Sequence, residues 1–281
     1  MINVKNLVSV TRINSLTGFL LLLIPTYWTL FLLSNGLPEN KYLLIFTLGA
    51  FFMRAAGCVI NDIFDKDIDV FVDRTKERPI ATGALSIKEA KLILVFLLII
   101  PFILLFYLKK ITVIFCLIAL FLTLLYPLAK RFFKVPQSVL GIAFSFNILI
   151  VGIELQEKIS IEVLLLFIAN FFWILAYDTQ YALNDLNDDL KLGINSSAIY
   201  FGKKVNSFIT IFQLLFIFFI WLTMSLSFDN DMFLFILLVC LCFFIFQSFM
   251  FKKQLMKKKQ LFHLNPIVGI LILVEIINQK I

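Results

Sequence analysis

The sequence has few of the residues that hold transition metals or build disulfide frameworks. It contains one histidine, His263, and four cysteines, all within apolar runs and without the spacing of a metal site. These absences argue against zinc and give no reason to expect disulfides. We expect the cysteines to pack as small hydrophobic residues: Cys58, Cys116, Cys240 and Cys242.

Charged residues and glycine are also scarce. Only 15% of the 281 residues are charged and ten are glycine, whereas 61% are apolar, 34 are phenylalanine and the mean hydropathy is +0.99. Soluble domains are about 45–50% apolar, and a soluble core of this size could not bury so much apolar surface. The composition therefore predicts an integral membrane protein. We expect no cleavable signal or transit peptide, since the stretch 17–33 is long enough to span and no small-residue cleavage pattern follows it.

The long apolar stretches predict an all-α fold, a single domain over residues 1–281. A membrane-spanning helix needs about 20 mostly apolar residues. Nine stretches meet this requirement: 16–34, 42–60, 90–107, 111–127, 139–153, 161–183, 207–226, 231–250 and 265–279.

The distribution of basic residues predicts the topology. With the N-terminus in the cytoplasm, only five of the 25 lysines and arginines lie outside, as the positive-inside rule requires. Cytoplasmic loops and anionic lipid then explain the net charge of +7 without a nucleic acid partner. The basic run 252–259 is interpreted as a lipid anchor, and His263 as solvated. The five outside residues are Lys41, Lys109, Lys110, Lys158 and Lys280.

An acidic stretch follows the second predicted span directly. If that helix continues to residue 69, Asn61, Asp62, Asp65 and Asp69 lie within about 100° of one another on its surface. Polar groups at the end of a membrane segment are costly and are functional candidates by default. The competing interpretation is a set of solvated carboxylates that balance the cytoplasmic lysines.

A second acidic stretch closes the sixth predicted span. On a continuous helix Asp178, Asp185 and Asp189 form a stripe within about 40°, and the predicted topology places both stretches on the cytoplasmic side. Clustered carboxylates repel one another unless cations neutralise them. Oxygen ligands favour Mg²⁺, which typically takes one or two carboxylates plus substrate phosphates. The pattern therefore predicts a diphosphate held through Mg²⁺.

Basic side chains accompany the acids on the same predicted side. Arg74 and Arg78 follow the first stretch, Lys191 follows the second, and Lys130 and Arg131 close the fourth span. Arginine matches phosphate oxygens with two parallel hydrogen bonds, and lysine acts as a point charge. This combination fits a substrate with a diphosphate head and a long apolar tail.

Several motifs, between about residues 12 and 202, resemble the UbiA superfamily of intramembrane prenyltransferases. The segments 54–65 (RAAGCVINDIFD) and 78–83 (RPIATG) carry the resemblance. The segments 126–131 (YPLAKR), 177–182 (YDTQYA) and 185–189 (DLNDD) are similar to the branch that prenylates 4-hydroxybenzoate. One departure is Arg12-Ile13, where that branch usually has a basic residue followed by proline.

The resemblance implies a helical bundle around a central cavity that opens to the cytoplasmic side of a bacterial inner membrane. It implies that Mg²⁺ is held by Asn61, Asp65, Asp69, Asp185 and Asp189. The diphosphate would be bound by Arg74, Arg78, Lys130, Arg131 and Lys191. Catalytic roles would fall to Asp62, to Asp178, which orients the phenol or takes a proton, and to Arg54, which pairs with the benzoate carboxylate or with an acid.

The implied reaction transfers a polyprenyl group from polyprenyl diphosphate to the carbon ortho to the hydroxyl of 4-hydroxybenzoate, in ubiquinone biosynthesis. The expected partners are these substrates and the lipid bilayer, with no nucleic acid or protein partner. Two alternatives stay open: a UbiA-type enzyme with another acceptor, of the menaquinone or haem O type, and a membrane transporter. Transporter acids tend to lie near the midplane of the bilayer, whereas most acids here lie at helix ends.

Overall fold

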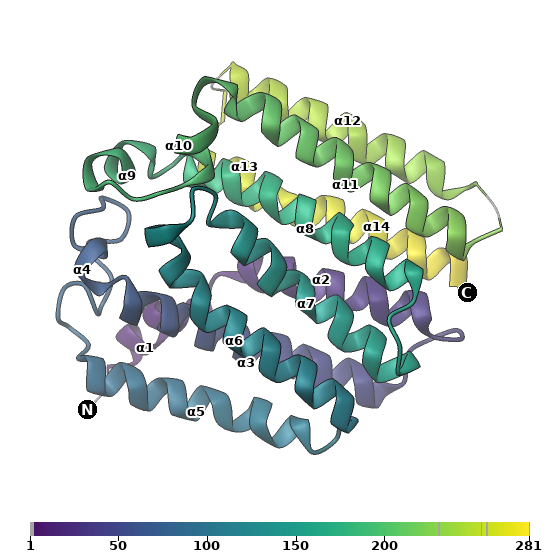
Figure 1. The fold of residues 1–281 in the computed structure, drawn as a ribbon, viewed down its shortest axis with the longest axis horizontal. Helices are drawn as coiled ribbons and strands as arrows, with labels where there is room; N and C mark the ends of the chain where they lie inside the picture. The colour runs from purple at the N-terminus through teal and green to yellow at the C-terminus, as the bar shows by residue number, and fades with distance from the viewer. Residues whose placement is uncertain (1–2, 230, 254, 257, 281) are drawn as a thin grey trace.

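The computed structural model describes residues 3–229, 231–253, 255–256 and 258–280, and within these ranges it is helical with no strand. Residues 254 and 257 of the basic run lie outside the described residues. Long helices run side by side and short ones lie at one end (Figure 1). In chain order they are α1 (Val4–Thr11), α2 (Leu16–Leu33), α3 (Asn40–Phe64), α4 (Lys66–Asp69), α5 (Ile87–Leu105), α6 (Lys110–Phe132), α7 (Gln137–Gln156), α8 (Ile161–Ala182), α9 (Leu186–Leu192), α10 (Ser197–Phe201), the 3₁₀ helix η1 (Gly202–Lys204), α11 (Val205–Ser227), α12 (Phe233–Lys252), α13 (Lys258–His263) and α14 (Asn265–Lys280).

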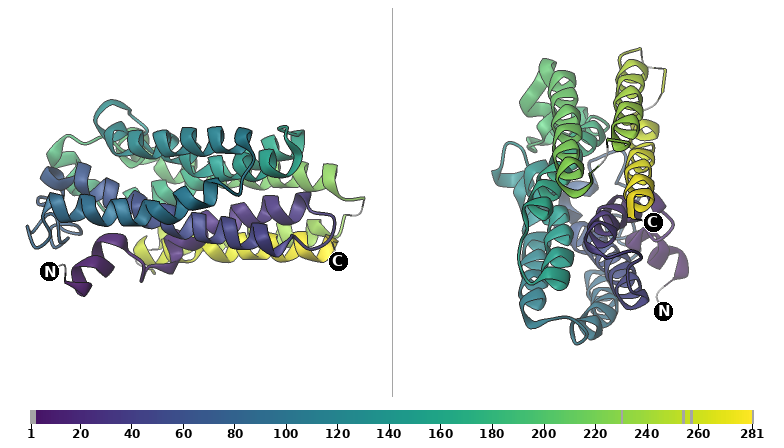
Figure 2. Two further views of the ribbon diagram at one scale, coloured as in Figure 1. Left: turned by 90° about the horizontal axis from the view of Figure 1, so that it is seen from below. Right: turned by 90° about the vertical axis from the view of Figure 1, so that its right-hand side faces the viewer.

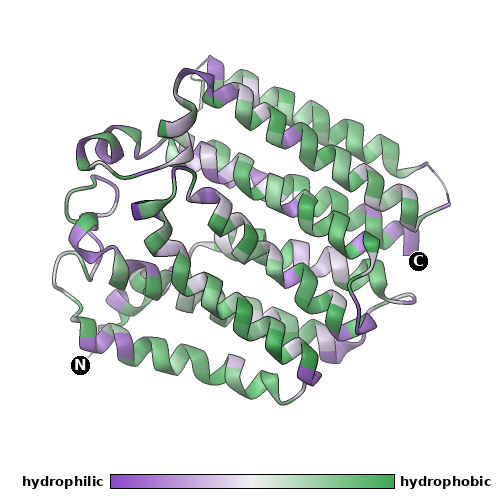
Figure 3. Ribbon diagram, viewed as in Figure 1, coloured by the Kyte–Doolittle hydropathy of each residue, from purple (hydrophilic) through white to green (hydrophobic). Residues whose placement is uncertain are grey.

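One long helix corresponds to each of the nine predicted stretches, which confirms the all-α prediction. Eight helical stretches of the described chain are long and apolar enough to cross a membrane. The ninth, α5, carries Lys88, Glu89 and Lys91 in its first turns. The long helices are apolar along their middles and hydrophilic residues gather toward the ends (Figure 3). The chain is thus a multi-pass membrane protein.

The fourth span is longer than predicted because proline does not end it. The prediction stopped at Pro127, but α6 continues through it to Phe132. Transmembrane helices tolerate proline where local adjustments satisfy the freed carbonyl groups. The extra turn carries Lys130 and Arg131 on the helix itself rather than on a loop.

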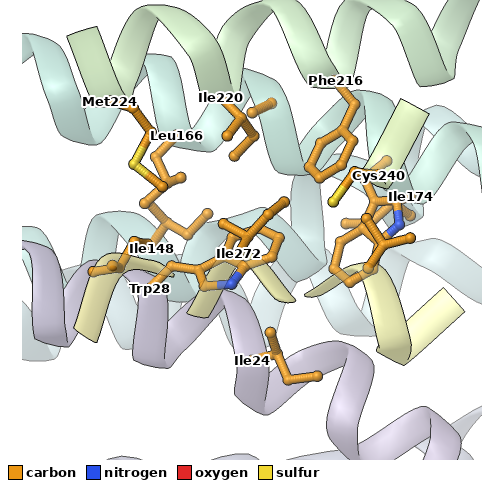
Figure 4. Packing of buried hydrophobic residues seen from close by; sticks show 14 of the residues in the cluster. Ile24, Trp28, Ile148, Leu166, Ile174, Phe216, Ile220, Met224, Cys240 and Ile272 are labelled. Carbon is orange, nitrogen blue, oxygen red and sulfur yellow. The ribbon is translucent and has the colours of Figure 1, made fainter. Parts of the chain in front are cut away.

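The packed core lies on the side of α8 that faces the C-terminal helices. The ring centre of Trp173 on α8 lies 5.2 Å from that of Trp28 on α2 and 5.5 Å from that of Phe216 on α11, and all three side chains are fully buried. Figure 4 shows Trp28 and Phe216 among the packed apolar side chains of this core. The indole N–H of Trp28 donates to the carbonyl of Gly269 on α14 at 2.9 Å. A Cβ at Gly269 would lie 2.7 Å from Trp173, so glycine permits the close approach of α14. Helix α11 therefore packs directly on α8, while α12 packs on α11 and α14, and α14 packs mainly on α2.

The other side of the bundle is more open. Helix α5 packs mainly on α3 rather than on α6, the next helix in the chain. The short helices α4, α9 and α13 and the turns around them lie at one end of the bundle in both views from the side (Figure 1; Figure 2, left). Both acidic stretches therefore belong to the same end of the molecule, as predicted.

Candidate active site

Both acidic helices break at an aspartate, so the predicted continuous helices are wrong. Helix α3 gives way to α4 at Asp65, and α8 gives way to α9 at 183–185. The two breaks are alike: the amide of Asp69 donates to the carbonyl of Asp65 at 2.8 Å, and that of Asp189 to Asp185 at 2.9 Å. Aspartate has a low helix propensity in a helix interior and is a favoured N-cap, the residue just before the first helical turn. Neither side chain makes the capping hydrogen bond, so both carboxylates are available to other partners.

Asp65 is paired with a lysine from a distant helix. Its Oδ2 accepts hydrogen bonds from the ammonium group of Lys130 at 2.8 Å and from the side-chain amide of Asn61 at 3.0 Å. Its Oδ1 is buried and has no partner within the described part of the chain. A carboxylate oxygen left unpaired beside a cavity is suited to a cation.

Arg78 joins two other carboxylates of the first stretch. Its Nη1 lies 2.9 Å from Asp62 Oδ1 and 2.7 Å from Asp69 Oδ2. Arg12 also donates to Asp62 Oδ1, a pairing that the sequence analysis did not anticipate. Burial raises the pKa of Asp69, while Arg78 opposes that shift. Asp62 is buried behind these arginines and does not line the cavity.

The second stretch is held to the first by Arg74. Its guanidinium group makes a two-pronged contact with Asp185, at 2.9 Å from Nε to Oδ1 and 2.5 Å from Nη2 to Oδ2. The same group lies 5.0 Å from the centre of the Tyr181 ring. Next to it, the amide of Asp73 donates to Asp188 Oδ2 at 3.1 Å. The two acidic stretches thus meet across one opening.

Asp189 lines this opening, and its carboxylate makes no hydrogen bond or ion pair with any described residue. Burial and, after it, the neighbouring Asp185 raise the pKa of its carboxyl group to about 6. An acid in this environment gains from a nearby cation, because the cation favours the charged form.

The opening leads into a cavity of about 820 Å³ lined by α2, α3, α5, α6, α7, α8 and α13. Its mouth carries the charged groups and its deeper walls are apolar. Phe102 on α5 and Leu117 on α6 both line it, yet they are 60% and 53% exposed on the outer surface. The cavity therefore also opens sideways between these two helices, toward the position of the lipid.

Arg54 and Asp178 line the cavity more deeply than the acidic breaks. Asp178 precedes Asp185 by seven residues, about 10 Å along a helix. Arg54 donates to the sulfur of Cys58 and makes no ion pair with Asp62 or Asp178 in the described structure. This leaves an arginine charge facing the cavity without a carboxylate partner.

Two predicted diphosphate ligands lie away from the cavity. Arg131 donates to the carbonyl of Phe64 at 3.2 Å, and Lys191 is 78% exposed at 3.9 Å from Asp188. Neither lines the cavity, whereas Arg74, Arg78 and Lys130 do.

The sequence analysis missed the contribution of α13. Lys259, Phe262 and His263 line the cavity, and the Nδ1 of His263 lies 2.7 Å from the hydroxyl of Thr17. His263 is exposed, as predicted, but it also lines the cavity, and part of the basic run predicted to anchor the chain to lipid lies in the cavity wall. The aromatic residues around His263 did not mark this segment as part of a site, because phenylalanine is common throughout the chain.

The residues at the mouth fit a divalent cation in chemistry. All candidate ligands are oxygen donors, and one oxygen of Asp65 is buried and unpaired. In the described residues no three carboxylate, thiol or imidazole groups converge as a ready metal site. Instead Lys130, Arg74 and Arg78 now supply the positive charge around the carboxylates.

The chain matches the UbiA prenyltransferase family over residues 22–267. It is 40% identical over 242 residues to the 4-hydroxybenzoate octaprenyltransferase of Francisella tularensis subsp. mediasiatica, covering 86% of this chain and 85% of that protein. It is 50% identical over 186 residues to the enzyme of the same name from Neisseria meningitidis serogroup C, covering 66% and 63%.

Two solved structures share the fold. A UbiA homolog from Aeropyrum pernix K1 superposes with a TM-score of 0.79 at 24% identity, covering 93% of this chain and 98% of that one. A UbiA homolog from Archaeoglobus fulgidus bound to GPP and Mg²⁺ has a TM-score of 0.74 at 15% identity, covering 97% and 99%. The helical bundle, its acidic mouth and these relatives agree, and the protein belongs to the UbiA prenyltransferase family.

Proposed function

We propose that this protein transfers a polyprenyl group from polyprenyl diphosphate to the ring carbon ortho to the hydroxyl of 4-hydroxybenzoate, as a step of ubiquinone biosynthesis. The reaction would take place in a bacterial inner membrane, with the N-terminus and the acidic mouth in the cytoplasm. One observation carries the proposal: the two acidic breaks, tied together by Arg74 and Asp185, stand at the mouth of a cavity with apolar walls. The names of the two relatives support the choice of acceptor.

The diphosphate would be held at the mouth. The carboxylates of Asp65, Asp69, Asp185 and Asp189, with Asn61, would hold Mg²⁺, which supplies neutralising charge and weakens the allylic C–O bond. The basic side chains that now pair with these carboxylates would bind phosphate oxygens. Asp62 would act as a positioning residue, because it is buried against the guanidinium groups of the mouth.

The aromatic acid would bind deeper, beneath the diphosphate. Arg54 has no carboxylate partner in the described chain and would bind the benzoate carboxylate. Asp178 would orient the phenol or take the ring proton released when the new C–C bond forms. Buried apolar walls keep water from the carbocation-like donor.

The prenyl tail would occupy the apolar part of the cavity. The distance along α6 from Lys130 to Cys116, both cavity residues, is about 21 Å for 14 residues. A longer tail would leave between Phe102 and Leu117, where the cavity reaches the lipid-facing surface.

The direct test is incubation of membranes containing the protein with a labelled polyprenyl diphosphate, Mg²⁺ and a panel of aromatic acceptors. We expect labelled 3-polyprenyl-4-hydroxybenzoate, lost on chelation and restored by Mg²⁺. Label on a naphthoate or on haem instead would identify another UbiA-type acceptor. Metal-dependent transport of an ion into proteoliposomes without any prenylated product would reject the enzymatic proposal.

A further inference from the structure

The mouth of the cavity has one wall to which the proposed function assigns no role. This wall is α13, whose Phe262 ring lies 4.7 Å from the ring of Tyr181 and 5.8 Å from that of Tyr177. Tyr181 in turn lies under the guanidinium group of Arg74 at 5.0 Å. Phe262 therefore supports the ring on which the arginine of the mouth rests.

A buried cluster of three glutamines fixes the position of α13. Gln247 on α12 accepts from Gln213 on α11 at 3.0 Å and from Gln180 on α8 at 3.3 Å. Its own amide donates to the carbonyl of Leu261, next to Phe262, at 2.9 Å. Asn265 donates to the same carbonyl at 3.3 Å. All four amide side chains are at most 4% exposed.

Such a cluster is costly in an apolar bundle. Buried amides lose water and must be hydrogen-bonded, and Gln180 Oε1 still has no partner among the described residues. Apolar side chains would pack α12 against α11 without this cost. What they could not supply is a directed bond to one backbone carbonyl of α13, and satisfied polar clusters specify one arrangement.

The contacts form a continuous path from the core to the mouth. Gln247 holds Leu261, the adjacent Phe262 supports Tyr181, Tyr181 supports Arg74, and Arg74 pairs with Asp185. We propose that Gln247, which does not line the cavity, is a positioning residue for the diphosphate end of the site. This inference rests on the proposed function only in taking the diphosphate as the ligand of the mouth.

The test measures kcat and KM for donor and acceptor in Gln247→Met, Phe262→Leu and the double variant, in purified protein at saturating Mg²⁺. Each single change should raise the KM for farnesyl diphosphate about tenfold and leave that for 4-hydroxybenzoate within about twofold. The double variant should be no worse than the worse single variant, because both act through α13. In Gln247→Glu the buried side chain is a neutral carboxylic acid, which keeps one hydrogen-bond donor and one acceptor. The KM for farnesyl diphosphate should therefore stay within about threefold of the wild-type value.

Asn170→Leu is the matched control. Asn170 is a buried amide of α8 that donates to Ser145 at 3.0 Å and has no part in this path. This variant should lower the melting temperature and leave the donor KM unchanged.

A lower melting temperature with an unchanged donor KM in Gln247→Met would overturn the proposal, and so would independent effects that multiply in the double variant. If Gln247→Met does not fold, an unchanged donor KM in Phe262→Leu would also overturn the proposal. A wild-type protein that transfers no prenyl group would instead reject the proposed function. In that case the thermal shift produced by geranyl diphosphate with Mg²⁺ still tests Gln247, and an equal shift in Gln247→Met would refute it.

Discussion

The ion pair between Asp65 and Lys130 offers a way to separate metal binding from simple charge balance. Their charged atoms are 2.8 Å apart, and the side chains are 3% and 29% exposed. At an effective dielectric constant near 20 the gross attraction is about 6 kcal/mol, most of it offset by desolvation. Asp65→Asn and Lys130→Met both break this pair, so each should lower stability by a similar amount, about 2 kcal/mol given the partial exposure of Lys130.

The two variants should differ in their need for Mg²⁺. Asp65→Asn removes a proposed ligand charge, and we expect the Mg²⁺ concentration for half-maximal rate to rise about 10- to 100-fold. Lys130→Met removes a cation that competes for Asp65 Oδ2, so its half-maximal Mg²⁺ concentration should stay the same or fall. Its donor KM should nevertheless rise about tenfold, because a charge-assisted hydrogen bond to the diphosphate is lost.

The assay is the initial rate of prenyl transfer across a series of buffered free Mg²⁺ concentrations, with melting temperatures measured on the same preparations. Equal displacement of the Mg²⁺ curves in the two variants would show that Asp65 acts only through its ion pair. An unshifted curve in Asp65→Asn would likewise contradict its assignment as a metal ligand.

Three further changes test other parts of the site. Asp189→Ala should reduce turnover by about 10²- to 10³-fold while the protein still accumulates in the membrane, and near-normal activity would exclude Asp189 from the metal site. Gly49→Phe adds a ring to the cavity at a position where a Cβ meets no atom within 4 Å. The kcat/KM for long-chain donors should fall about 10- to 200-fold, while that for geranyl diphosphate should change little. Equal losses for all donors would refute the assigned tail path. In Gly18→Ala the new Cβ would lie 2.7 Å from Arg54 Nε and would displace that side chain. The kcat/KM for 4-hydroxybenzoate should therefore fall about 10- to 100-fold. An unchanged value would refute the role of Arg54 in binding the benzoate carboxylate.

The parts of the structure that follow from local sequence were predictable. Apolar stretches of membrane length became helices, because only helices satisfy the backbone of a single segment in lipid. The clustering of the acidic stretches at one end also followed from the sequence. Asp65 and Asp185 were recognised by their place after an apolar stretch, although not as helix breaks, since whether an aspartate ends a helix depends on its surroundings.

The pairings within the site could not be predicted in the same way. Arg12 reaches Asp62 across 50 residues, and Phe262 reaches Tyr181 across 81, through the packing of α1 and α13, which carry no distinctive motif. Arg131 has the same charge as its neighbour Lys130, and only the helical turn directs one to Asp65 and the other to a backbone carbonyl. Such contacts are set by tertiary packing rather than by spacing.

The central claim is that one divalent ion at the mouth binds both acidic stretches and the diphosphate. Mn²⁺ can replace Mg²⁺, and electron–nuclear double resonance detects phosphorus atoms bound near it. With farnesyl thiodiphosphate bound, we predict a ³¹P coupling in the wild-type protein that is absent in both Asp65→Ala and Asp189→Ala. A coupling that persists in both variants, or none in the wild type, would contradict the account.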